Sequence, residues 1–248
     1  EAFIVATTGR PGPVLVDIPK DIQFAKTNYF KPKKEKNTKG KIHNRFSEKE
    51  IDNLIELISK AKKPVVYTGG GVINSGPKAS EALREFVRLI GFPITSTLQG
   101  LGAFPGDDNQ FIGMLGMHGT YEANNAMHDC DLLINIGARF DDRITGKIDE
   151  FSPKSKKVHI DIDPSSINKI IKVDLAIVGD VNEVLKATIK KINKKQNGFK
   201  NSNKQNTSKW WEQIQKWRLK NSLGFINSDQ NIKPQHAVQR LYELTKNQ

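Results

Sequence analysis

Residues 131–146, DLLINIGARFDDRITG, decide the fold of this chain. The apolar run at 132–136 predicts a buried strand of a parallel sheet. Gly137 follows at once, and a glycine directly after such a strand lets the backbone turn sharply and approach a ligand closely. Arg139 and Arg143 come next, with two aspartates between them, and guanidinium groups suit phosphate oxygens. A charged surface turn would explain the charges equally well, but the position after a strand favours a ligand.

Strands and helices alternate on both sides of this stretch. We expect strands at 63–67, 92–96, 132–136, 157–162 and 175–178, and helices at 47–58, around 83–90, at 121–128 and at 181–192. This alternation predicts an α/β fold with a doubly wound parallel sheet and right-handed crossovers. The glycine-rich segment 97–119 reads as a long loop, and a loop of that length inside a compact domain is usually functional.

The chain divides into five segments by composition. Residues 1–22 read as a helix end, a Gly/Pro turn and a strand at 13–18, and 23–46 as a lysine-rich linker. The α/β unit covers 47–193, a second polar linker 194–208, and a tryptophan-containing helical tail 209–248. Because the chain starts and stops as though inside helices, we expect a piece of a longer protein.

Composition narrows the function classes. The net charge is +12, but the lysines gather at 31–41 and 190–209, where few aromatic rings could stack on bases, so we expect no nucleic-acid partner. The lone Cys130 excludes an internal disulfide and fits a reducing compartment. The five histidines show no metal-ligand spacing, and no apolar run approaches the roughly 20 residues of a membrane span.

Four further positions suit a ligand cleft at the ends of the strands. Gly69–Gly71 would bare backbone N–H groups, and 115–119 brings small residues and a soft methionine. Asp161 lies at the end of a strand, where a carboxylate can accept ribose hydroxyls, and Asp180 follows the strand at 175–178. Taken singly, a flexible turn, a plain loop and helix caps explain these residues as well or better. Together with the paired arginines they indicate a cleft.

With residues 8–21 (TGRPGPVLVDIPKD) and 115–119 (LGMHG), the run at 137–146 resembles the acetolactate synthase (acetohydroxyacid synthase) large subunits. That family consists of thiamine-diphosphate enzymes that also carry FAD. The resemblance implies that 1–22 ends an N-terminal pyrimidine-binding domain and that 47–193 is a Rossmann-like central FAD-binding domain. It also implies that 209–248 begins a C-terminal diphosphate-binding domain.

The resemblance also implies residue roles. Contacts to the flavin or its ribityl chain would come from Arg10, Gly69, Gly70 and Gly71, with Thr97, Leu98, Leu115, Met117 and His118 packed around it. The pyrophosphate region would meet Gly137, Ala138, Arg139, Asp141 and Arg143, and the adenosine end Asp161, Ile162, Asp180 and Val181. The family commonly has Glu in place of Asp161. Lys20, Met117, Asp142 and Arg143 match positions lining the family's substrate channel.

The implied reaction condenses two pyruvates, or pyruvate and 2-oxobutyrate, with loss of CO2, in branched-chain amino acid synthesis. The family's activating glutamate and its Gly-Asp-Gly motif for Mg2+ have no match here, so we expect no catalytic residue in these 248 residues and no activity from them by themselves. A homodimer or tetramer, a small regulatory subunit, and a cytoplasmic or plastid location are further expectations.

The main alternative is glyoxylate carboligase or another FAD- and thiamine-diphosphate-dependent enzyme of the same fold. A plain NAD-type or deacetylase-like domain would predict a GxGxxG turn or metal-binding cysteines, and the sequence has neither. An interaction module that uses the basic linkers would predict aromatic residues among the lysines, and these are absent.

Overall fold

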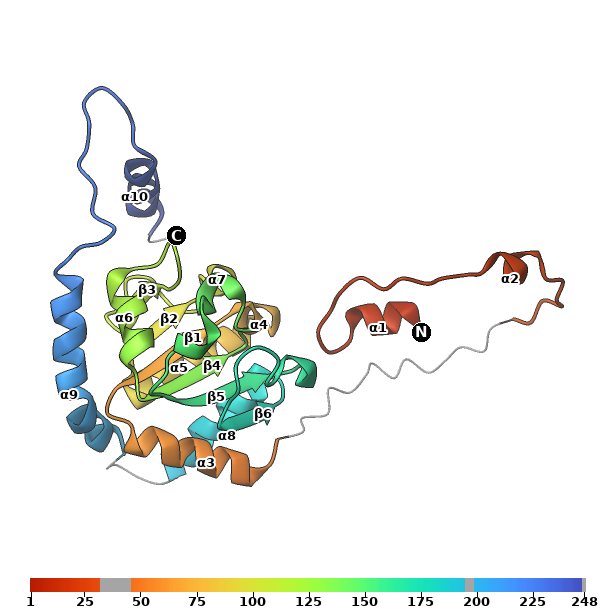
Figure 1. Cartoon of the computed structure of the whole chain (residues 1–248), viewed down its shortest axis with the longest axis horizontal. Helices are drawn as coiled ribbons and strands as arrows, with labels where there is room; N and C mark the ends of the chain where they lie inside the picture. The colour runs from red at the N-terminus through yellow and green to blue at the C-terminus, as the bar shows by residue number, and fades with distance from the viewer. Residues whose placement is uncertain (32–45, 195–198, 247–248) are drawn as a thin grey trace.

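A six-stranded, all-parallel sheet forms the centre of the protein (Figure 1). The computed structural model describes residues 1–31, 46–194 and 199–246, with side chains omitted at 199–202. The strands lie in the order β3-β2-β1-β4-β5-β6, which is typical of doubly wound dinucleotide-binding sheets. They are β1 (Pro64–Thr68), β2 (Ile94–Ser96), β3 (Phe111–Met114), β4 (Leu132–Ile136), β5 (Lys156–Asp161) and β6 (Leu175–Val178). The predicted fold class is confirmed.

Helices cover both faces of the sheet, which explains why the central strands β1 and β4 are buried along their whole length and are mostly apolar. One face packs against α3 (Glu48–Lys60), α5 (Pro77–Ile90) and α8 (Val181–Lys194), and the other against α6 (Tyr121–Asp129) and α9 (Phe199–Arg218). The α3 helix starts with a capping box, in which Ser47 and Glu50 bond each other's backbone N–H groups. Each layer therefore buries the apolar stripe that its sequence period predicts.

Several short elements were not predicted, and three of them lie around the ends of β1, β2 and β4. The helices α4 (Gly70–Asn74) and α7 (Asp142–Thr145) follow β1 and the turn after β4, and β3 lies within the stretch that reads as a loop. The β3 segment is hard to recognise because it is four residues long and contains Gly113, whose φ is +88°. The long loop is thus interrupted by an edge strand.

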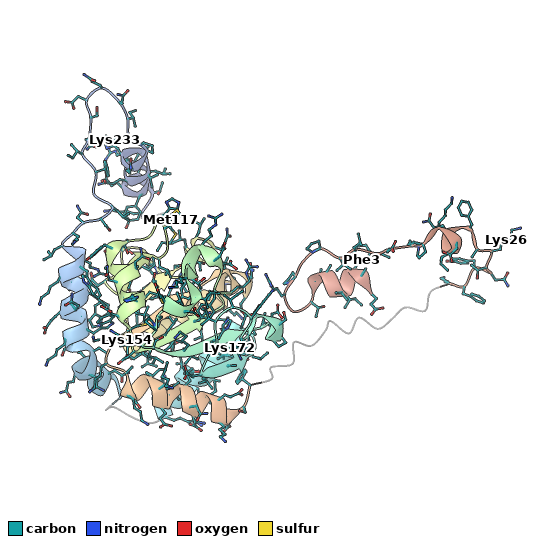
Figure 2. All side chains as sticks on the ribbon, viewed as in Figure 1. Phe3, Lys26, Met117, Lys154, Lys172 and Lys233 are labelled. Carbon is teal, nitrogen blue, oxygen red and sulfur yellow. The ribbon has the colours of Figure 1, made fainter. Side chains whose placement is uncertain are left out.

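The first residues of the chain extend away from the sheet on the side of β5 and β6 (Figure 1). They form α1 (Ala2–Thr7) and α2 (Lys20–Phe24), and Figure 2 shows Phe3 and Lys26 standing off from the main body. The strand predicted at 13–18 does not form there, because a strand needs a neighbour for its N–H and C=O groups. Most of the predicted linker 23–46 lies outside the described residues.

The tail of the chain packs on the sheet through α9. This helix begins at Phe199, within the stretch predicted as a polar linker. Trp210 is 3% exposed, and its Nε1–H donates to the carbonyl of Pro64 at 3.0 Å. The Arg218 guanidinium at the end of α9 donates to the carbonyls of Asn109 and Phe111, beside and within β3. After a connecting segment, α10 (Pro234–Thr245) stands apart from this helix (Figure 1).

Within the described ranges, none of the helices is both long and apolar enough to span a bilayer.

Candidate functional site

A cleft opens at the carboxyl ends of the strands, where β1 and β4 lie side by side and the connections leave in opposite directions. Its volume is about 1110 Å³, above the ~300–1000 Å³ of ordinary small-molecule pockets, so it suits an extended ligand. Fourteen of the predicted cofactor residues line it: Arg10, Gly70, Gly71, Thr97, Leu98, Gly137, Ala138, Arg139, Asp141, Arg143, Asp161, Ile162, Asp180 and Val181.

Two glycine turns meet backbone to backbone at the floor of the cleft. The Gly71 N–H donates to the carbonyl of Gly137 at 3.0 Å, and a Cβ on Gly71 would lie 2.8 Å from Gly137 Cα. Gly69 packs against Gly137 and Ala138 and does not line the cleft. Its N–H donates to the carbonyl of Ile136. The prediction of bare N–H groups is therefore wrong for Gly69 and Gly71. These glycines instead let two loops close on each other at the floor of the cleft.

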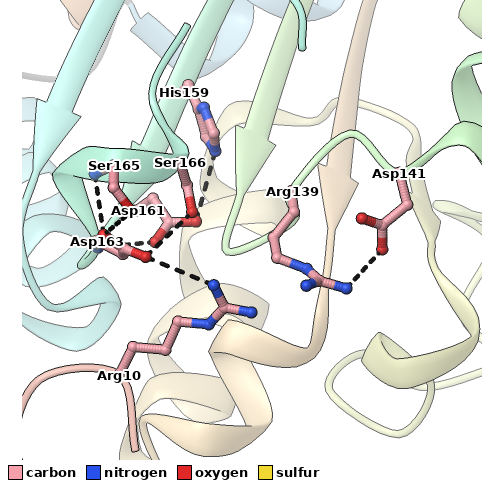
Figure 3. Close-up of polar contacts among 8 residues, drawn as sticks. All are labelled: Arg10, Arg139, Asp141, His159, Asp161, Asp163, Ser165 and Ser166. Atoms are coloured by element: carbon pink, nitrogen blue, oxygen red, sulfur yellow. Dashed lines mark hydrogen bonds and ion pairs between the residues drawn. The ribbon is translucent and has the colours of Figure 1, made fainter. Parts of the chain in front are cut away.

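Positive charge lies on one wall of the cleft. The Arg139 guanidinium donates to Asp141 Oδ2 at 2.8 Å, with both side chains about half exposed (Figure 3). Among the described residues the Arg143 guanidinium has no hydrogen-bond or ion-pair partner, and it reaches the cleft from α7. An uncompensated guanidinium at this edge is suited to phosphate or carboxylate oxygens.

Carboxylates gather at the other end of the cleft (Figure 3). Asp161 is 7% exposed, and its Oδ1 accepts the Asp163 N–H at 2.9 Å. Asp163 accepts the Ser165 hydroxyl at 2.7 Å and lies 3.5 Å from Arg10 Nη1, and these contacts hold the pKa of its carboxyl below the usual value. This end of the cleft offers acceptors for hydroxyl groups, as a ribose would need.

Asp180 caps α8 and lines the cleft at the same time. Its Oδ2 accepts the Ser75 hydroxyl at 2.8 Å, and its Oδ1 accepts the N–H of Asn182 at 2.9 Å. The helix-cap explanation is therefore confirmed, and the contact between Asp180 and a ligand stays a prediction. Ser75 itself also lines the cleft, although nothing in the sequence singled it out.

Several predicted residues lie away from the cleft wall. Leu115 is buried in the core against α6, and Met117 and His118 are exposed on the following turn, with Met117 at the surface in Figure 2. Lys20 lies on α2, with its Nζ 5.9 Å from the centre of the Phe24 ring. Asp142 is exposed at the start of α7 and accepts the N–H of Arg143. Of the four proposed channel residues, the structure thus brings Arg143 alone to the cleft.

Sequence reasoning missed Tyr67, which also lines the cleft. It is the penultimate residue of β1, so its place beside the switch between β1 and β4 was the available signal. Its side chain is fully buried, and burial, with the nearby negative charge of Asp141, raises the pKa of its hydroxyl well above the usual value. The other missed lining residues include Ile73, Asn74, Gln99, Ile144 and Ser166. No group of three or more His, Cys, Asp or Glu side chains within the described part is arranged to hold a metal ion.

Comparison with known proteins agrees with the architecture. The family model described as "Thiamine pyrophosphate enzyme, central domain" matches residues 51–188. The acetolactate synthase large subunit of Buchnera aphidicola subsp. Schizaphis graminum is 44% identical over 99% of this chain and 42% of its own length. The large subunit of Haemophilus influenzae is 42% identical over all of this chain and 43% of its own length. The chloroplastic acetolactate synthase 1 of Zea mays is 41% identical over 99% of this chain and 38% of its own length. The chain thus spans about two fifths of these relatives.

Proposed function

This chain belongs to the thiamine pyrophosphate enzyme family, and we propose that it is part of an acetolactate synthase large subunit. The observation that carries the proposal is the cleft at the strand switch, together with similarity to acetolactate synthases along nearly the whole chain. The described residues would then be a central domain at 47–193, flanked by the end of an N-terminal domain at 1–22 and the start of a C-terminal one. Because α9 packs on the central domain, we propose that the C-terminal domain begins after Arg218 and not at residue 209.

The cleft fits FAD by shape and charge. The meeting of Gly71 and Gly137 leaves no side chain between a ligand and the backbone, as a close approach by a dinucleotide requires. Arg143 and Arg139 would hold the diphosphate, and Asp161 would accept ribose hydroxyls at the opposite end. We propose that FAD binds here in an extended pose and has a structural role, because the condensation of two 2-oxo acids involves no net redox change.

Thiamine diphosphate, when bound, supplies the electron sink for decarboxylation of a 2-oxo acid. We expect the residues that activate it and bind Mg2+ to lie outside these 248 residues. Pyruvate would be the donor, and pyruvate or 2-oxobutyrate the acceptor. Arg143 would orient the acceptor's carboxylate or the cofactor's phosphate with its guanidinium. A homodimer or tetramer, a regulatory subunit, and a location in the bacterial cytoplasm or in plastids complete the proposal.

The test uses the full-length protein purified without added cofactor. We expect bound FAD, and acetolactate formed from pyruvate when thiamine diphosphate and Mg2+ are present. Arg143→Ala should raise the dissociation constant for FAD by roughly tenfold or more, since a hydrogen bond to a charged group contributes about 1.5–3 kcal/mol.

Arg88→Ala is the matched control, because Arg88 pairs with Asp108 and does not line the cleft. Folded protein that neither contains nor binds flavin would contradict the FAD assignment. Activity on glyoxylate in place of pyruvate would favour glyoxylate carboligase.

A further inference from the structure

A buried histidine lies behind the carboxylate that we propose to bind ribose. His159 is on β5, two residues before Asp161, so the two side chains point to the same face of the sheet. The His159 ring is fully buried, with the ring of Phe140 edge-on at 5.1 Å between ring centres. Among the described residues neither ring nitrogen has a hydrogen-bond partner. A buried N–H without a partner destabilises a protein, so this imidazole needs an explanation.

The imidazole faces the carboxylate of Asp161 (Figure 3). The His159 Nε2 atom lies 3.5 Å from Asp161 Oδ2, about 0.5 Å farther than in a typical N–H···O hydrogen bond. Because the terminal torsion of an aspartate side chain is soft, a small rotation of the carboxylate closes a gap of this size. The pair is therefore poised to form a hydrogen bond without any movement of the strand.

Asp161 connects this buried pair to the cleft. Its side chain is 9% exposed and Asp161 lines the cleft, whereas the side chain of His159 is fully buried and His159 does not line it. A carboxylate has about four lone-pair sites on its two oxygens. The Asp163 N–H takes one site on Oδ1 at 2.9 Å, and a donor on Nε2 would take one on Oδ2. Each oxygen then keeps one site, as the two neighbouring hydroxyls of a ribose require.

We propose that His159 is a positioning residue, whose Nε2–H donates to Asp161 Oδ2 and fixes the plane of that carboxylate for the two ribose hydroxyls of the bound dinucleotide. The inference rests on the proposed binding of FAD and adds a residue that the sequence did not single out. The bond requires the tautomer that carries its proton on Nε2. His159 touches no ligand and acts through Asp161 alone.

The test compares ADP with 2′,3′-dideoxy-ADP on the flavin-free full-length protein, because these two ligands differ only in the ribose hydroxyls. The wild type should bind ADP roughly tenfold more tightly or better, since hydrogen bonds to a charged group are involved. In His159→Leu most of this preference should be lost, and the dissociation constant for FAD should rise roughly three- to thirtyfold. The affinity for FMN, which lacks the ribose, should not change.

Two further substitutions separate positioning from a structural role. The amide N–H of His159→Gln reaches about as far as Nε2, and that of His159→Asn about as far as Nδ1. We expect the glutamine variant to keep the preference for ADP and the asparagine variant to lose it. If His159→Leu does not fold, His159→Asn takes its place. His128→Leu is the control, because His128 is exposed on α6 and outside the cleft, and it should change neither affinity nor preference.

A structural role would lower the melting temperature of the variants and leave the preference of the folded protein for ADP unchanged, and that result would overturn the proposal. Equal losses for FMN and FAD, or equal behaviour of the glutamine and asparagine variants, would overturn it as well. A wild type that binds FAD but does not distinguish the two ADP ligands would remove the ribose contact and this inference with it. Wild-type protein that binds neither FAD nor ADP would overturn the proposed cofactor itself.

Discussion

Replacing Gly137 by alanine tests whether the contact between two glycine turns holds the cleft together. Gly137 has a φ of +67°, and a Cβ there would lie 2.9 Å from Gly71 Cα and 3.1 Å from Val72 N. The backbone penalty is about 1–2 kcal/mol for a left-handed L-residue. Overpacking against backbone atoms adds about 1–3 kcal/mol. We therefore expect Gly137→Ala to lower the free energy of unfolding by roughly 2–5 kcal/mol.

The matched control is Gly91→Ala. Gly91 has a similar φ of +76° at the end of α5, but a Cβ there would have nothing within 4 Å. Gly91→Ala should therefore lower the free energy of unfolding only by the backbone penalty of a left-handed residue, about 1–2 kcal/mol. The difference between the two variants measures the close approach of the turns without the shared conformational penalty.

Thermal denaturation of the flavin-free full-length protein, followed by circular dichroism, is the assay. For a domain of this size, 1 kcal/mol corresponds to a shift of about 2–4 °C in Tm. Gly137→Ala should thus melt roughly 4–20 °C below the wild type. If the two variants lose the same stability to within about 0.5 kcal/mol, which is the usual effect of a neutral substitution, the turns do not press on each other and the reasoning is wrong.

Two further predictions concern the core. Burial raises the pKa of the Cys130 thiol to about 11, so as the pH rises the unfolded chain loses this proton before the folded protein does. The stability that the buried thiol contributes is therefore present below about pH 9 and is lost as the pH rises toward 11. Urea titrations over this range should show the free energy of unfolding fall by about 2–3 kcal/mol, and Cys130→Ala should abolish that fall. The same pH dependence of the free energy of unfolding in Cys130→Ala as in the wild type would disprove this prediction. Trp210→Phe removes the N–H that donates to the Pro64 carbonyl and should lower the free energy of unfolding by about 1–3 kcal/mol, seen as a lower urea midpoint. Trp217→Phe, which changes the ring that packs against Trp210, should cost less, and equal losses in the two variants would contradict the prediction.

Most of the fold follows from the sequence, because the strands at the centre of the sheet are mostly apolar and the helices that cover them have a strong apolar period. The capping box at Ser47 and the buried strand at 132–136 are examples in which local signals and tertiary packing agree. The strand at 13–18 failed for a physical reason, since its pattern describes a strand but no neighbouring strand pairs with it among the described residues. The helix at Phe199 was missed because its first half is polar and gains its stability by packing on other elements.

The candidate site was predictable where a residue's place in the chain fixes its place in space. Residues at or shortly after the ends of parallel strands, such as Gly71, Gly137 and Asp161, converge on the cleft because all strand ends meet at one edge of the sheet. Met117 was not placed at the cleft, because it lies on a loop whose path depends on contacts that sequence spacing does not encode. Tyr67 was missed because it ends a continuous apolar run, where a ligand contact and a core residue look alike.

The position of Arg218 has a consequence for the solubility of folding intermediates. β3 is an edge strand, and an edge with free carbonyls is a template for pairing with another chain. The Arg218 guanidinium occupies two of the carbonyls along this edge, at Asn109 and Phe111, with a positive charge that another strand cannot approach closely. A chain in which α9 has not yet docked therefore exposes an unprotected edge, and late docking of this helix favours intermolecular strand pairing over completion of the fold.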